Sequence, residues 1–100
     1  MNIVGITSCP SGVAHTYMAA ESLEQAAKAN GIGVKIETQG SSGPENVLTA
    51  EEIKNADFVI LTNDTAISGT ERFKGKKVIQ LSAQKIIAKS DALMKKLLTM

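Results

Sequence analysis

The sequence is poor in the residues that build crosslinks and large aromatic clusters. It has one cysteine, Cys9, and only three aromatic side chains, with no tryptophan among them. A single cysteine excludes an internal disulfide, and a reducing compartment keeps such a thiol free. With so few aromatic rings, the core has to consist mainly of Ile, Val, Leu, Ala and Met side chains.

Signals for export, membrane insertion and nucleic-acid binding are also missing. No apolar run approaches the roughly 20 residues that span a bilayer. The first residues lack the basic region and cleavage site of a signal peptide. The 11 Lys and Arg residues nearly balance the 10 Asp and Glu residues, and a net charge of +1 argues against a dedicated nucleic-acid binder. We therefore expect a cytoplasmic protein with no direct membrane insertion and no nucleic-acid partner.

The composition is that of a small folded domain without a metal centre. A length of 100 residues fits one domain, residues 1–100, and 43% apolar residues predict a packed core. One Cys, one His and scattered carboxylates form no cluster with the spacing of metal ligands. We expect neither a metal nor another cofactor.

Apolar patterning predicts strands that alternate with helices. Strands are expected at residues 2–7, 34–38, 58–61 and 78–81, and helices at about 13–30, 49–56 and 82–98. Such alternation predicts an α/β fold, a single three-layer domain with a four-stranded parallel sheet of order 2-1-3-4 and helices on both faces. The segment 39–44 is predicted to be a loop. In such sheets the chemistry lies at the carboxyl ends of the strands, where the strand order reverses.

The loop after the first predicted strand carries the strongest chemical signal. It reads Cys9-Pro10-Ser11-Gly12-Val13-Ala14-His15-Thr16 and leads directly into a predicted helix. Free N–H groups and the dipole at a helix amino terminus favour negative charge, so a thiol there has a lowered pKa and a larger thiolate fraction. The same N–H groups can surround a phosphate oxyanion. A nucleophile and an anion cradle in one loop predict a covalent phosphocysteine on Cys9.

The spacing of this loop also matches cysteine phosphatases, with one difference. A cysteine, five residues, a basic residue and a hydroxyl residue form their layout, but His15 stands where they have arginine. Arginine clamps phosphate oxygens with a rigid, permanently charged fork, whereas histidine is only partly charged near neutrality. His15 therefore favours a site that holds and hands on a phosphoryl group. A cysteine phosphatase or arsenate reductase relative, a phosphate-binding module without catalysis, and a merely structural cysteine remain alternatives.

The same residues support a resemblance to a known family. The segment from Cys9 to Glu21 resembles the signature of the enzyme IIB component of the bacterial phosphotransferase system, fructose-specific type. Residues 34–43, 48–53, 56–57 and 72–76 resemble other stretches of that family in order. The family is often fused to IIC or IIA domains, so we expect either a free-standing subunit or one domain of a larger protein.

The resemblance implies partners and site residues. A phosphohistidine on a IIA protein phosphorylates Cys9, and the phosphocysteine then phosphorylates a fructose-like sugar bound by the IIC membrane permease. The cradle for the phosphate consists of Pro10, Ser11, Gly12, Val13, Ala14, His15 and Thr16.

Three further features each allow a functional and a non-functional interpretation. Residues 39–43 form either a rim that contacts IIA or IIC, or a plain solvent turn. Asp64 either orients His15 or acts as an acid, or is an ordinary loop aspartate. The cationic run Arg72, Lys74, Lys76 and Lys77 either binds an acidic partner or is a solvated face.

Overall fold

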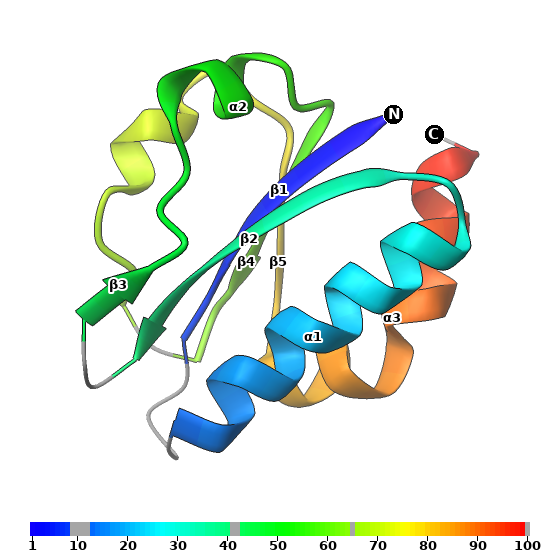
Figure 1. The fold of residues 1–100 in the computed structure, drawn as a ribbon, viewed down its shortest axis with the longest axis horizontal. Coiled ribbons are helices and arrows are strands. Elements are labelled where there is room, and N and C mark those ends of the chain that lie inside the picture. Colours follow the sequence, from blue (N-terminus) through cyan, green and yellow to red (C-terminus); the bar gives the residue numbers. More distant parts are fainter. Residues whose placement is uncertain (9–12, 41–42, 65, 100) are drawn as a thin grey trace.

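The computed structural model describes residues 1–8, 13–40, 43–64 and 66–99, and of Val13 and Ala14 it describes only the backbone (Figure 1). Strands and helices alternate along most of the chain, as the sequence predicts. The elements are β1 (Asn2–Thr7), α1 (Val13–Ala29), β2 (Gly33–Gly40), β3 (Gly43–Glu45), α2 (Ala50–Lys54), β4 (Phe58–Thr62), the 3-10 helix η1 (Thr70–Phe73), β5 (Val78–Leu81) and α3 (Ala83–Leu98).

The sheet corrects the predicted strand count. It has five strands in the order β3-β2-β1-β4-β5, and β3 runs antiparallel to β2. The other four strands are parallel, and their order matches the predicted 2-1-3-4. The predicted loop at 39–44 was wrong in part, because β2 continues to Gly40 and Gly43 starts β3. Three residues that include Pro44 are too short for a periodic signal, and an edge strand tolerates a proline because it leaves one side of the ladder unpaired.

Local signals account for the helix boundaries. Thr49 caps α2 with a reciprocal capping box, in which Glu52 N–H donates to the Thr49 hydroxyl and Thr49 N–H donates to the Glu52 carboxylate. Ser82 caps α3 by accepting from Lys85 N–H. Gly31 has a φ of 70° just after α1, and it ends the helix close to the predicted residue 30. The four-residue helix η1 lies between the predicted strands 58–61 and 78–81, where no element was predicted.

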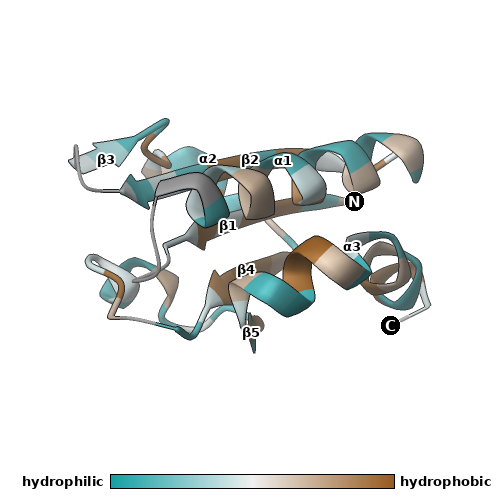
Figure 2. Cartoon of the chain, turned by 90° about the horizontal axis from the view of Figure 1, so that it is seen from below, coloured by the Kyte–Doolittle hydropathy of each residue, from teal (hydrophilic) through white to brown (hydrophobic). Residues whose placement is uncertain are grey.

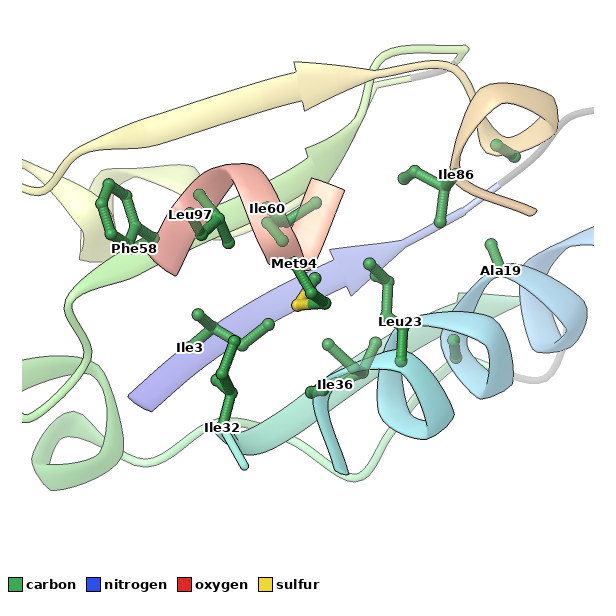
Figure 3. Packing of buried hydrophobic residues seen from close by; sticks show 14 residues of the cluster. Ile3, Ala19, Leu23, Ile32, Ile36, Phe58, Ile60, Ile86, Met94 and Leu97 are labelled. Carbon is green, nitrogen blue, oxygen red and sulfur yellow. The ribbon is translucent and has the colours of Figure 1, made fainter. Parts of the chain in front are cut away.

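Two apolar clusters lie on opposite faces of the sheet, as expected for helices on both faces. Successive residues of β1 and β4 alternate between these faces. Figure 3 shows the larger cluster, in which Leu23 of α1 and Met94 of α3 point toward Ile36 and Ile60 of the sheet. On the other face, Ile53 of α2 and Phe73 of η1 belong to the second cluster. Figure 2 shows that the edge strand β3, by contrast, is hydrophilic.

Candidate functional site

The carboxyl end of β1 is held between its two neighbouring strands. Ser8 N–H donates to the Thr62 hydroxyl at the end of β4, over 2.9 Å. The Ser8 hydroxyl donates to the Gln39 carbonyl oxygen of β2, over 2.8 Å. Since β2 and β4 flank β1, Ser8 lies at the point where the strand order reverses. The chain therefore enters the Cys9 loop from a fixed, buried position.

The start of α1 is tied to the same end of β1. Figure 1 shows that α1 begins at the end of the sheet where β1 finishes. The Thr7 hydroxyl, which is buried, donates to the Thr16 carbonyl oxygen over 2.9 Å. The first turn of α1 contains no acidic side chain, so nothing in that turn opposes an anion by charge. The strand end and the helix amino terminus thus bracket the loop that contains Cys9.

The predicted site residues divide into three groups. Cys9, Pro10, Ser11 and Gly12 lie outside the described residues. Val13 and Ala14 form the first turn of α1, and His15 follows them on an exposed position. Thr16 is buried, and its hydroxyl oxygen has no hydrogen-bond partner among the residues that the structure describes.

A buried ion pair supports the carboxyl end of β2 from the α2 side of the sheet. The Glu37 side chain is 2% exposed, and it accepts from Arg72 Nη1 over 3.0 Å and from Nη2 over 3.2 Å. Gln39 Nε2 and the Leu48 N–H also donate to this carboxylate. Burial raises the pKa of Glu37, but the hydrogen bonds from Arg72, Gln39 and Leu48 outweigh it and hold the pKa below its ordinary value. Glu37 is therefore a stable anion near neutrality.

Gln39 connects β2 to the segment that follows β4. Its side-chain Nε2 donates to the Ser68 carbonyl oxygen over 2.9 Å, and the Ser68 N–H donates to Gln39 Oε1 over 3.0 Å. The residues after β4 are thereby attached to the end of β2. Of the predicted rim, Gln39 is an internal tie rather than part of a plain solvent turn, while Ser41 and Ser42 lie outside the described residues.

Tyr17 joins α1 to the β2–β3 hairpin. Its hydroxyl donates to a carboxylate oxygen of Glu45 in β3. The pKa of Tyr17 is raised, first because the hydroxyl donates to Glu45 and then because of partial burial and the Glu45 charge. Neither the hairpin nor this contact follows from the local sequence pattern.

Asp64 and two side chains of the cationic run make contacts within the protein. Asp64 accepts from the Ala83 N–H over 2.7 Å and so caps the first turn of α3. In the cationic run, Arg72 pairs with Glu37, and Lys76 donates to the carbonyl oxygens of Lys54 and Ala56. At least these two cations hold the fold together rather than form an open basic face.

Comparison with known proteins assigns the chain to a family. A family model described as "PTS system, Lactose/Cellobiose specific IIB subunit" matches residues 4–96. The chain belongs to the IIB family of the phosphotransferase system. The resemblance of the Cys9 segment to this family is thereby confirmed.

Relatives of this IIB chain include both short and long proteins. It is 56% identical over 95 residues to the "PTS system fructose-like EIIB component 2" of Escherichia coli strain K12, which covers 95% of this chain and 90% of the relative. It is 48% identical over 101 residues to the "Fructose-like PTS system EIIBC component" of the same strain, which covers 99% of this chain and 21% of the relative. A crystallised domain of a fructose-specific IIABC component from Borrelia burgdorferi is 49% identical, with a TM-score of 0.88 and coverage of 95% and 90%.

Sequence reasoning missed the Glu37–Arg72–Gln39 network of this IIB chain. A carboxylate in the middle of a buried strand was the available signal, because Glu37 lies between Ile36 and Thr38, both buried. Its cationic partner lies 35 residues away, which no local pattern reveals. Within the described ranges, no three His, Cys, Asp or Glu side chains gather to hold a metal ion, and no helix is long and apolar enough to cross a membrane.

Proposed function

We propose that this IIB protein carries a phosphoryl group on Cys9, between a IIA phosphohistidine and a fructose-like sugar bound by a IIC permease, in the cytoplasm. The observation that carries the proposal is the tie between the end of β1 and α1, the Thr7–Thr16 hydrogen bond of 2.9 Å. Cys9 follows Ser8 directly in the sequence, and in this proposal its thiol acts close to the amino end of α1. The names of the relatives support the sugar class and the IIC partner.

The chemistry consists of two in-line displacements at phosphorus. The Cys9 thiolate attacks, the S–P bond forms, and the N–P bond to the donor imidazole breaks, after which that nitrogen takes a proton. A sugar hydroxyl oxygen then attacks, the O–P bond forms, the S–P bond breaks, and the hydroxyl proton leaves to solvent or a base. Such transfers depend mainly on positioning and on neutralising the phosphoryl oxygens. No oxidant or reductant takes part.

The residues after Cys9 supply the neutralisation in this proposal. Backbone N–H groups from Ser11 to His15 surround the phosphoryl oxygens, with Pro10, Gly12, Val13 and Ala14 shaping the turn. The Thr16 hydroxyl is buried beside the strand end and offers a further donor. The backbone cradle provides most of the binding, and His15 adds charge only when it is protonated.

The decisive experiment is the intact mass of the protein after incubation with phosphoenolpyruvate, the general phosphotransferase enzymes and a IIA protein. We expect the mass of one added phosphoryl group in the wild type and none in Cys9→Ala. His15→Ala retains partial transfer, because the backbone N–H groups remain. Complete loss in His15→Ala would show that the imidazole is central to the cradle.

Two controls separate the proposal from its rivals. Rapid release of inorganic phosphate from a chromogenic phosphate ester would show that the protein is a cysteine phosphatase and not a phosphoryl carrier. Phosphate binding that persists in Cys9→Ser, without any covalent phosphorylation of the wild type, would leave only a binding module. A carrier gives neither result, and its phosphoryl group disappears when a matching IIC permease and a sugar are added.

A further inference from the structure

The Gln39 side chain connects β2 to the segment between β4 and η1. Gln39 belongs to β2, and Ser68 follows β4, while β1 lies between these two strands. The Gln39 carbonyl oxygen accepts from the Ser8 hydroxyl, so Gln39 lies beside the end of β1, where Ser8 leads into Cys9. The side chains of Gln39 and Glu37 lie on the same face of the sheet, because residues two apart in a strand point to the same side.

The contacts of this side chain require an amide. Gln39 Nε2 donates to Glu37 Oε2 over 2.9 Å and to the Ser68 carbonyl oxygen over 2.9 Å, while Oε1 accepts from Ser68 N–H over 3.0 Å. A carboxylate has no protons for the first two bonds, and an ammonium group cannot accept the third. The bidentate contact with Arg72 fixes Glu37, so the acceptor that orients the Gln39 amide does not move.

We propose that Gln39 is a positioning residue for phosphoryl transfer, which holds the segment 66–69 against the end of β2 and so keeps two walls of the Cys9 site at a fixed spacing. This inference rests on the proposed carrier function. Displacement of a reacting group by about 1 Å can cost roughly a hundredfold in rate. Loss of the amide therefore slows the chemical step without removing the nucleophile. Binding of the IIA protein, which covers a larger surface, depends less on this one side chain.

The test compares two Gln→Met variants of the full chain, because methionine keeps the length and shape of glutamine without its amide. Gln39→Met removes the bridge, whereas Gln25→Met removes an exposed amide contact to Glu21 within α1. Transfer from phosphorylated IIA protein to Cys9 is followed by quenched-flow mass analysis, and urea unfolding reports the folded fraction. For Gln39→Met we expect kcat about tenfold lower, an unchanged KM for phosphorylated IIA and complete phosphorylation at long times. Gln25→Met behaves as the wild type.

Three outcomes overturn the inference. A Gln39→Met protein that is less stable in urea but transfers with unchanged kcat shows a purely structural role. A rise in KM alone shows that Gln39 belongs to the docking surface for IIA. If Gln39→Met does not fold, Gln39→Asn serves instead, since its shorter amide cannot reach Glu37 and Ser68 together, and unchanged kcat in that variant refutes the proposal. Failure of the wild type to take up a phosphoryl group would reject the carrier function itself.

Discussion

Replacing a single residue should lower stability most at the ion pair between Glu37 and Arg72. The carboxylate is almost fully buried, whereas the guanidinium keeps 27% of its side chain exposed. Removing one partner of such a pair leaves an uncompensated buried charge, which costs far more than the pair itself contributes. The Arg72 guanidinium also lies 5.4 Å from the Phe73 ring centroid and donates to the Gly69 carbonyl oxygen. One side chain thus connects β2, the turn before η1 and the second apolar cluster.

Arg72→Met is therefore expected to lower the free energy of unfolding by about 3 kcal/mol at neutral pH. Urea unfolding measures the loss, and Lys74→Met provides the control, because Lys74 is an exposed cation two residues away. A loss equal to that of the control would contradict the assignment of a buried ion pair.

The lowered pKa of Glu37 predicts a pH dependence with a definite sign. A carboxyl group whose pKa falls on folding stabilises the protein above its unfolded pKa, about 4.3 for glutamate. This contribution is lost as the pH falls from there through the lower pKa of the folded state. In Glu37→Gln, the free energy of unfolding should therefore fall less as the pH is lowered through this range. Identical acid limbs in the two stability profiles would show that Glu37 does not carry it.

Among the elements, α1 and the edge strand β3 are linked by a side-chain hydrogen bond. Tyr17 on α1 donates to Glu45 on β3, so the helix that follows the Cys9 loop is attached to the edge strand. Tyr17 is the only tyrosine and the chain has no tryptophan, so its ionisation is visible in the ultraviolet absorbance without interference.

In an alkaline absorbance titration, the midpoint for Tyr17 is expected above about 10, the ordinary pKa of tyrosine. Glu45→Gln removes the charged acceptor, so the midpoint should fall toward that ordinary value. Glu71→Gln on η1 is the control, since its carboxylate is exposed and belongs to another element. Equal midpoints in the wild type and Glu45→Gln would mean that α1 and β3 are not joined in this way.

The whole molecule depends on close contact between the central strands. Gly5 lies in β1, between Ile36 of β2 and Ile60 of β4. A Cβ atom at Gly5 would lie 2.7 Å from the Ile60 carbonyl oxygen and 3.1 Å from Ile36 Cδ1. β1 and β4 cannot separate to make room without opening both apolar clusters, because each strand contributes side chains to both.

Gly5→Ala should consequently lower the free energy of unfolding by about 1–3 kcal/mol, the usual cost of an overpacked core. The urea midpoint is expected to fall with an unchanged slope, as for a single cooperative transition. Gly40→Ala is the matched control, because the nearest atom to its added Cβ is the Tyr17 hydroxyl at 3.9 Å. Equal midpoints for the two variants would show that the sheet can spread.

Most of the architecture could be predicted because its signals are local. The buried stripe of α1, the capping box at Thr49 and the continuous apolar strand β4 each lie within a short window of sequence. The short strand β3 and the helix η1 could not be predicted in this way. Each has too few residues to show a period, and β3 exists only because β2 is beside it.

The sequence alone determined the alternation of strands and helices, the helix ends and the position of Cys9 in the chain, after the first strand and before the first helix. Periodicity, capping and turn chemistry act between neighbours in the chain, so one sequence suffices to detect them. Only the tertiary structure decided that Gln39 meets Ser68 and that Glu37 meets Arg72, across 29 and 35 residues. Such contacts depend on how the sheet brings distant loops to one edge, and local preferences carry no record of that arrangement.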